Sequence, residues 1–246
     1  GMTRSFVEAD ATHRDDLALG YGWVNGEYVA QPYEVYVTTP ASSIDATVAD
    51  MARLLEALTA DGANRHGRLF SAEMAEAVRM PQFRPHPEFL GTTHGLHESL
   101  EASGESRVPV RTVDHGGTMA GFGSLMAILP DSKIGVFVVT NKSGGGRNPL
   151  AAAVMTAVVA SLELPPQRAQ TPMPERDAKR DLSEFVGSYY YGVFAHAPTP
   201  DEYGNGAWRR GPPRVVAAEG GALTIGDETY SPRGGDVFVR ADGERK

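Results

Sequence analysis

The sequence predicts an α+β fold, in which helices pack against an antiparallel sheet, followed by a small C-terminal β region. Three observations predict this fold. Residues 122–129 and 134–140 are apolar, β-rich runs that are joined by the turn residues of 130–133. Residues 47–61 repeat apolar side chains at helical spacing. Residues 165–180 are rich in proline and charge, and they separate this part of the chain from a region of short strands and turns.

The N-terminal elements are predicted from turn and capping residues. Residues 17–28 form a short hairpin that turns at Asn25-Gly26. The helix at 47–61 begins at Thr47, where Asp50 three residues later resembles a capping box, and it stops at Gly62. A second helix covers residues 71–80, and residues 81–93 form a proline-rich loop.

The sheet and the elements after it follow from the same rules. Strands at 95–102 and 108–114 join the two apolar strands in an antiparallel sheet of about four strands. A helix at 150–162, with Asn148 as its N-cap, is almost entirely apolar, so we expect most of its surface to be covered. Further strands are expected at 189–194, 214–218, 223–225 and 237–240.

These elements define three regions. Residues 1–164 form a first domain, residues 165–180 a linker, and residues 181–246 a small β domain. With 246 residues, of which 41% are hydrophobic, the chain is long enough to bury a core. The N-terminal residues carry no signal-peptide pattern, and Gly1 before Met2 is either a cloning remnant or a start in mid-domain. The compartment is left open.

Composition excludes several classes of function. A net charge of −8 leaves no basic surface for nucleic acid. No apolar run approaches the roughly 18 residues that a membrane-spanning helix needs. The chain has no cysteine, which excludes disulfides, thiolate catalysis and cysteine-bound zinc. His94, His97 and Glu98 do not predict a metal site, because residues three apart on a strand face opposite sides.

Residues 115–117, His-Gly-Gly, are the best candidate for chemistry. They stand just before the strand at 122–129, and glycines let a backbone edge approach a ligand closely. By contrast, Gly144-Gly145-Gly146 is interpreted as a loop, because no Gly-Lys-Ser/Thr follows it to complete a phosphate-binding motif.

Four segments resemble one known family. They are residues 1–3 (Gly-Met-Thr), 40–55 (PASSIDATVADMARLL), 115–141 (beginning His-Gly-Gly) and 182–191 (LSEFVGSYYY). Together they resemble the C-terminal part of the serine β-lactamase and penicillin-binding-protein superfamily, in its class C β-lactamase, esterase and D-aminopeptidase branch. The resemblance implies the C-terminal portion of the β-lactamase/transpeptidase-like fold. Residues 182–191 resemble the opening of a lipocalin-like barrel, which the remaining length would leave partial.

The resemblance also implies roles for four residues. His115 matches the third catalytic motif of the family, and Gly116 and Gly117 would bind substrate. The backbone N–H of Thr118 would be one oxyanion-hole donor. The family reaction forms and hydrolyses an acyl-enzyme, and its substrate could be a β-lactam, a D-amino-acid peptide or a small ester. No metal or organic cofactor is implied.

This sequence departs from the family at the nucleophile. No serine is followed three residues later by lysine, and no Tyr-x-Asn precedes His115; the Tyr203-Gly-Asn205 match lies after it. Family order places both motifs before residue 1, so we expect the catalytic half to be truncated or to lie on another chain. The chain alone is therefore predicted to be inactive, and a small acyl substrate would need the missing half.

The alternative hypothesis is a non-catalytic remnant or a binding and oligomerisation module of the same fold. Loss of half the fold would expose apolar sheet and helix surface, which favours self-association. We therefore expect a homo-oligomer.

Overall fold

The computed structural model describes most of the first region and part of the second. The described residues are 1–7, 13–34, 39, 42, 44–84, 89–103, 108–142, 149–162, 181–189, 214–234 and 237–240. The chain divides into two compact units, residues 1–167 and 168–246. The whole of the expected linker, residues 165–180, lies outside the described residues, as do the N-cap position Asn148 and the Gly144–Gly146 loop.

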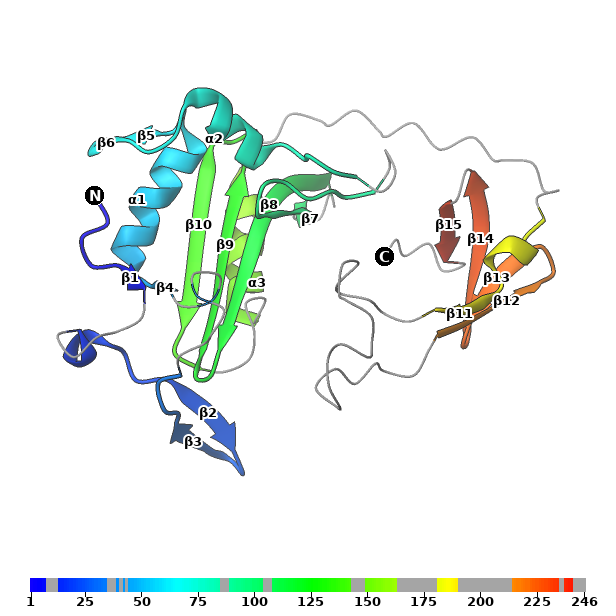
Figure 1. Ribbon diagram of the computed structural model, residues 1–246, viewed down its shortest axis with the longest axis horizontal. Coiled ribbons are helices and arrows are strands. Elements are labelled where there is room, and N and C mark those ends of the chain that lie inside the picture. Colours follow the sequence, from blue (N-terminus) through cyan, green and yellow to red (C-terminus); the bar gives the residue numbers. More distant parts are fainter. Residues whose placement is uncertain are drawn as a thin grey trace. The chain divides into compact units, whose positions relative to one another are not determined.

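A four-stranded antiparallel sheet forms the centre of the first unit (Figure 1). Its order is β10 (Ile134–Thr140), β9 (Phe122–Leu129), β8 (Val108–Met119) and β7 (His97–Ser103). The predicted α+β class with an antiparallel sheet is confirmed. β8 extends five residues beyond the predicted end at Asp114, because β9 continues to pair with it as far as Met119 opposite Phe122. The His-Gly-Gly motif therefore lies inside a strand and not before one.

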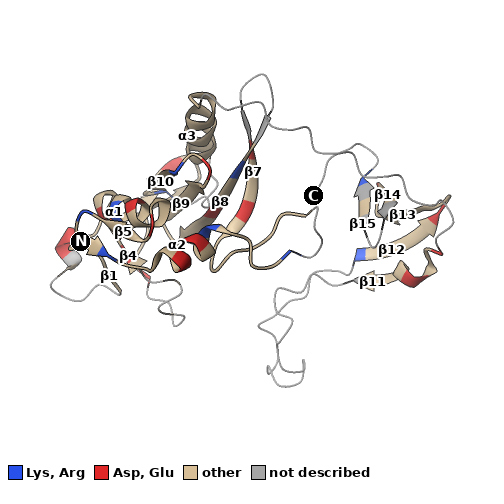
Figure 2. Cartoon of the chain, turned by 90° about the horizontal axis from the view of Figure 1, so that it is seen from above, with Lys and Arg blue, Asp and Glu red and all other residues tan. Residues whose placement is uncertain are grey.

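Helices cover the two faces of this sheet (Figure 2). α1 (Val48–Thr59) packs on one face and α3 (Pro149–Ala160) on the other. The α1 core contains Leu55, Leu58, Leu96, Val113 and Ile128. The α3 core contains Val110, Leu125, Ala127, Leu129, Val136, Val138, Ala151, Met155 and Val159. Each strand alternates its side chains between these two cores, as the period of two requires.

The predicted ends of the helices are present. The Thr47 hydroxyl accepts a hydrogen bond from the Asp50 backbone N–H, at 3.2 Å, and so caps α1. Gly62, at φ +88°, ends the helix in the left-handed conformation. Ser71 caps α2 (Ala72–Arg79) in the same way, accepting from the Met74 N–H at 3.1 Å.

The expectation that most of α3 is covered was wrong. Only Ala151, Met155 and Val159 are buried, a single stripe at intervals of four residues. Leu150 is exposed, as are several alanines. Alanine has little apolar surface, so its exposure costs little, and an apolar composition does not by itself require a covered helix.

A hairpin of β2 (Tyr21–Val24) and β3 (Glu27–Ala30) extends away from the sheet (Figure 1). Asn25 and Gly26 both have positive φ, which confirms the predicted tight turn. The base of the hairpin is tied to the sheet, because the Tyr21 N–H donates to the carbonyl oxygens of Gly121 and Asn141.

Short elements complete the first unit. They are β1 (Phe6–Val7), the single-turn helix η1 (Arg14–Asp16), β4 (Ile44–Asp45), β5 (Ala63–Asn64) and β6 (Gly67–Arg68). β1 pairs with β4, and β5 with β6. None of them was predicted, because two-residue strands have no periodicity to detect.

The second unit is a five-stranded antiparallel sheet with its own core. Its strands follow chain order: β11 (Gly187–Tyr189), β12 (Arg214–Glu219), β13 (Ala222–Ile225), β14 (Glu228–Gly234) and β15 (Val237–Arg240). The short helix η2 (Ser183–Phe185) precedes them, and Leu182, Val216 and Leu223 form the buried core. β14 was not predicted, since Pro232 interrupts it and its register shifts there. Residues 190–213, which include Tyr203-Gly-Asn205, lie outside the described residues.

Candidate active site

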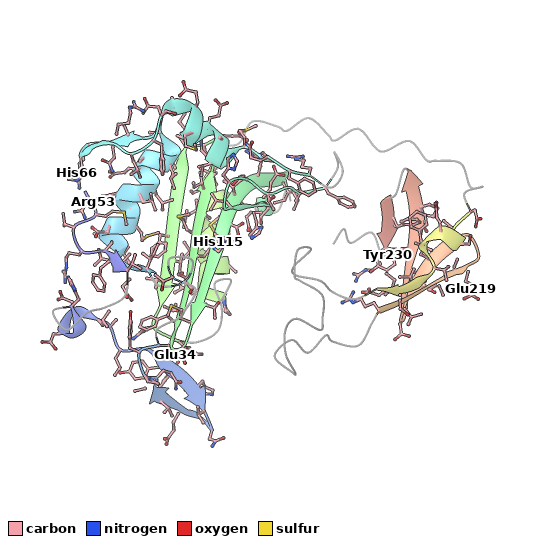
Figure 3. The ribbon with its side chains drawn as sticks, viewed as in Figure 1. Glu34, Arg53, His66, His115, Glu219 and Tyr230 are labelled. Atoms are coloured by element: carbon pink, nitrogen blue, oxygen red, sulfur yellow. The ribbon has the colours of Figure 1, made fainter. Side chains whose placement is uncertain are left out.

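The four predicted site residues are consecutive on β8 and alternate between its faces. His115 lies opposite Met126 of β9, and Gly117 opposite Ser124. Val113, two residues earlier, belongs to the α1 core, so His115 and Gly117 face that side of the sheet. Gly116 and Thr118 face the α3 side. His115, Gly116 and Thr118 are exposed (Figure 3 labels His115 on the sheet).

One edge of β8 is unpaired beside these residues. β7 accompanies β8 only as far as His97 opposite Asp114, and no other strand of the described ranges pairs with residues 115–119 along that edge. Met119 and Phe122 close a two-residue turn and form its first hydrogen-bonded pair. From there back along β8, the backbone N–H and C=O groups of successive residues point alternately toward β9 and away from it. That alternation directs the N–H groups of Gly116 and Thr118 toward the unpaired edge. A substrate carbonyl could reach the Thr118 N–H from this side.

Gly117 has a second physical reason to be glycine. A Cβ atom at this position would lie 2.5 Å from the Ser124 hydroxyl oxygen. The space above Gly117 is therefore occupied by a polar side chain of the neighbouring strand. A ligand that lies against Gly117 would meet the Ser124 hydroxyl, which residue patterns did not single out.

His97 is the closest aromatic neighbour of His115. The two rings are nearly parallel, with centroids 5.7 Å apart and planes at 20°. Both side chains are exposed, and they come from neighbouring strands. The sequence analysis considered His97 only with His94, as a metal site that it rejected. It predicted that the two strands pair, but not the register that places His97 opposite Asp114, next to His115. The structure brings His97 to His115 instead.

A buried carboxylate supports the start of β7. Glu98 accepts hydrogen bonds from Arg84 (2.7 Å), Arg111 (2.6 Å) and the Gly91 backbone N–H (2.9 Å). Burial by itself raises the pKa of Glu98, but these three donors outweigh it and hold the pKa below the ordinary value. Arg111 also donates to the Arg79 carbonyl at the end of α2. The network thus connects the loop at Gly91 and the C-terminal end of α2 with the neighbouring strands β7 and β8, next to His97.

Asp50 has a different role from the helix cap that was predicted. Its carboxylate is buried and accepts from the Arg4 backbone N–H (2.7 Å), the Ser5 hydroxyl (2.8 Å) and Arg53. Desolvation opposes ionisation, but these bonds lower the pKa of Asp50. Asp50 therefore attaches the N-terminal residues to α1. The sequence pattern did not predict this contact, because Arg4 and Ser5 lie more than forty residues before Asp50 in the chain.

Other features of the first unit lie away from this edge. A wide depression of about 590 Å³ is lined by residues of α1, α2 and the β9–β10 turn: Thr59, Ala60, Asp61, Ala72, Glu76, Arg79 and Lys133. None of the predicted site residues lines it. Within the described residues, no group of three His, Asp or Glu side chains is placed to hold a metal ion. No described helix is long and apolar enough to cross a membrane.

Comparison with solved structures identifies similar folds. The chain aligns with an octameric penicillin-binding protein homologue from Pyrococcus abyssi at 19% identity and TM-score 0.51, over 97% of this chain and 52% of that one. It aligns with a protein named SurE at 19% identity and TM-score 0.52, over 92% and 48%. A class C β-lactamase aligns at 19% identity and TM-score 0.49, over 67% and 48%. The chain thus spans about half the length of each.

Comparison by sequence gives the family. No curated protein matches the chain. The family model for Beta-lactamase matches residues 1–160, which is more than half of the chain and contains the whole β7–β10 sheet with its His-Gly-Gly motif. The chain belongs to the Beta-lactamase family.

Proposed function

We propose that the first unit forms one side of a serine hydrolase site, namely the side that carries the family's third motif. The site would act on an amide, lactam or ester carbonyl. The observation that supports it is the His115-Gly116-Gly117 segment, with His115 and Gly116 exposed, on a strand edge that has no partner strand in the described residues, within a Beta-lactamase family chain. In such a site the Thr118 N–H stabilises the oxyanion, and the His115 imidazole donates or accepts a proton beside it.

The two motifs that would carry the nucleophile and its proton-transfer groups are missing from these 246 residues. Because the chain has no Ser-x-x-Lys and no Tyr-x-Asn before His115, it offers an oxyanion donor without an activated serine. We therefore propose that the chain alone does not turn over substrate, and that a small acyl substrate is hydrolysed only with a polypeptide that supplies both motifs.

The test is acylation followed by complementation. The purified chain is incubated with a reactive β-lactam and with an activated ester, and its intact mass is measured. We expect no adduct and no hydrolysis above the buffer rate. A stoichiometric adduct on any serine of the chain would show that the nucleophile argument is wrong.

Complementation then tests His115. A polypeptide carrying Ser-x-x-Lys and Tyr-x-Asn is added, and ester hydrolysis is compared for the unchanged chain, His115→Ala and His66→Ala. His66 is an exposed histidine on a separate part of the first unit (Figure 3). General acid–base groups contribute about 100-fold or more, so His115→Ala should lower the restored rate by roughly that factor. Equal rates for the two variants would remove His115 from the mechanism.

A second candidate function is an oligomerisation module of the same fold. The absence of a nucleophile favours it, and the Pyrococcus abyssi homologue with a similar fold is octameric. Under this proposal the chain forms a homo-oligomer, and its sheet serves assembly and not turnover. The complementation test separates the two candidates, because an oligomerisation module acquires no hydrolytic activity when the polypeptide with both motifs is added.

A further inference from the structure

The β2–β3 hairpin gathers three aromatic rings on one of its two faces. The register places Trp23 directly opposite Tyr28, and Tyr21, two residues before Trp23, shares their face. The Trp23 and Tyr28 rings have centroids 4.6 Å apart and planes at 71°. The Tyr21 and Tyr28 rings have centroids 6.4 Å apart and planes at 80°. The three rings, which we call the aromatic corner, therefore meet nearly at right angles and not in a flat stack.

The aromatic corner is accessible to a ligand. Trp23 is 54% exposed and Tyr28 is 58% exposed, while Tyr21 at the base of the hairpin is half-buried. Tryptophan and tyrosine offer large, rigid contact surfaces that lose little conformational entropy when a ligand covers them. The faces of the rings carry partial negative charge, so a corner of this kind suits a cation.

A cation already lies at the aromatic corner. The Lys142 ammonium nitrogen is 5.7 Å from the Trp23 ring centroid and 5.6 Å from the Tyr28 ring centroid. Both distances fall within the roughly 6 Å over which a ring attracts a cation. In the described part of the chain, no carboxylate lies within ion-pair distance of this ammonium. The rings are thus the partners that the structure shows for it.

The base of the hairpin holds the aromatic corner in place. The Tyr21 backbone N–H donates to the carbonyl oxygens of Gly121 (3.3 Å) and Asn141 (3.0 Å), and the Asn141 side-chain amide donates to the Leu19 carbonyl at 3.0 Å. Tyr21 also forms a parallel bridge with Lys142, directly after Asn141. A ligand at this corner therefore meets rings that are already positioned, which lowers the entropic cost of binding.

The corner suits a methylated ammonium better than the lysine that lies there. A lysine ammonium is strongly hydrated and has three N–H donors, which ring faces satisfy poorly. A methylated nitrogen has few or no N–H donors and an apolar surface, so it leaves water at lower cost and packs against the rings. The net charge of −8 also attracts cations to the chain.

We propose that the aromatic corner binds the methylated ammonium group of an organic cation, and that the Lys142 ammonium stands in for this group in the free chain. The site goes beyond the proposed function, because it uses neither His115 nor any other residue of that site. Lys142 is exposed on a flexible side chain and can withdraw into water. Its charge competes with the ligand, so removal of that charge should strengthen binding.

The first test follows the indole N–H signal of Trp23 by NMR while choline chloride is added to the full chain at constant ionic strength. The chain has two tryptophans, so Trp208→Phe assigns the signal. We expect a saturable shift with a Kd of about 1–10 mM, as suits a few cation–π contacts. The matched ligand is 3,3-dimethylbutanol, which has the shape of choline without its charge. It should bind at least about 10-fold more weakly. No shift with choline, or equal binding of the two ligands, would overturn the proposal.

The second test changes the corner and reads the same Trp23 signal. Tyr28→Leu removes one ring and should weaken choline binding at least about 10-fold, whereas Tyr28→Phe keeps the ring and should bind within about 3-fold of the unchanged chain. Lys142→Met should bind at least about 3-fold more tightly. Phe83→Leu, at an exposed aromatic residue outside the hairpin, should have no effect. Circular dichroism checks that each variant is folded.

Two outcomes of the second test contradict the proposal. Equal affinities of Tyr28→Leu and Tyr28→Phe would show that the ring is not the partner of the cation. Weaker binding by Lys142→Met would show that Lys142 contacts the ligand and does not stand in for it. Vesicles of phosphatidylcholine distinguish the two sources of a methylated ammonium: sedimentation of the chain with vesicles, reversed by free choline, assigns a lipid headgroup, and choline binding without sedimentation assigns a free cation.

Discussion

Glu98 is the residue whose charge joins most of the segments around the candidate site. Its carboxylate is almost fully buried and is shared by Arg84, Arg111 and the Gly91 N–H. Burying an ion costs free energy unless donors replace the lost water, and here three donors do so. Glu98 directly follows His97 on β7, so loss of this network would loosen the strand that carries His97 against His115.

Glu98→Gln tests this network. The amide keeps the shape but leaves two arginines without their counter-charge, so we expect the free energy of unfolding at neutral pH to fall by about 2 kcal/mol. The matched control is Glu56→Gln on the exposed face of α1, which should change it by less than about 0.5 kcal/mol. Urea denaturation followed by circular dichroism measures both.

The same variant has a predicted pH dependence. Because the pKa of Glu98 lies below its ordinary value of 4.5, its charge stabilises the folded chain above that pH, and this stabilisation is lost as the pH falls through the lowered pKa. The difference between the unchanged chain and Glu98→Gln should therefore shrink below that ordinary value. A difference that stayed constant down to the acid transition would show that ionisation of Glu98 contributes nothing.

At the scale of elements, the position of α1 depends on the glycine that ends the helix and on a glycine of the sheet that lies against it. Its C-terminal stop, Gly62, has φ +88°, and a Cβ atom there would lie 2.3 Å from the Phe70 carbonyl oxygen. Gly135 of β10 allows the helix to approach the sheet, since a Cβ atom there would lie 2.8 Å from that of Leu55. The position of α1 over the sheet thus depends on residues that have no side chain.

Two glycine variants distinguish the free-energy cost of a left-handed backbone from the cost of a steric collision. Gly26→Ala, at φ +91° in the β2–β3 turn with open space around it, should cost about 1 kcal/mol for the left-handed backbone alone. Gly62→Ala adds a collision with backbone atoms that cannot rotate away, so it should cost at least about 2 kcal/mol more. The measurement is the free energy of unfolding of each variant, and equal losses would contradict the collision.

At the scale of the whole molecule, the chain has two units, each of which has buried core residues of its own. The cores of the first unit lie on the two faces of the β7–β10 sheet, and the second unit buries Leu182, Val216 and Leu223. Among the described residues of the second unit this core has three buried members, and a core of that size stabilises a small sheet only modestly. Two cores of unequal size favour two separate unfolding events.

Calorimetry of the full chain should therefore show two transitions, the second unit unfolding at the lower temperature. Leu223→Ala removes buried methyl groups at a cost of about 3 kcal/mol and should shift the lower transition alone. Ile128→Val, in the first unit, should shift the upper one alone by about 1 kcal/mol. One transition that both variants move would show that the units unfold together.

Local chemistry made much of the fold predictable from the sequence. Thr47, Ser71, Gly62 and Asn25-Gly26 act on neighbours within a few residues, so the helix ends and the hairpin turn could be predicted before any contact was known. The alternating strands of the sheet and the His-Gly-Gly segment that resembles the family's third motif could equally be predicted, because both consist of consecutive residues. The covering of α3 was mispredicted, since composition does not show which apolar residues find a partner.

The α+β class, the order of the main elements and the position of the His-Gly-Gly segment follow from the sequence alone. The surroundings of that segment became known from the fold: the stacking of His97, the Ser124 hydroxyl over Gly117, and an edge beyond Asp114 that no described strand pairs with. It also showed that Asp50 holds the N-terminal residues and that the apolar hairpin is exposed. The reason is physical: these contacts join residues far apart in the chain, and their partners are set by strand register, which no local pattern encodes.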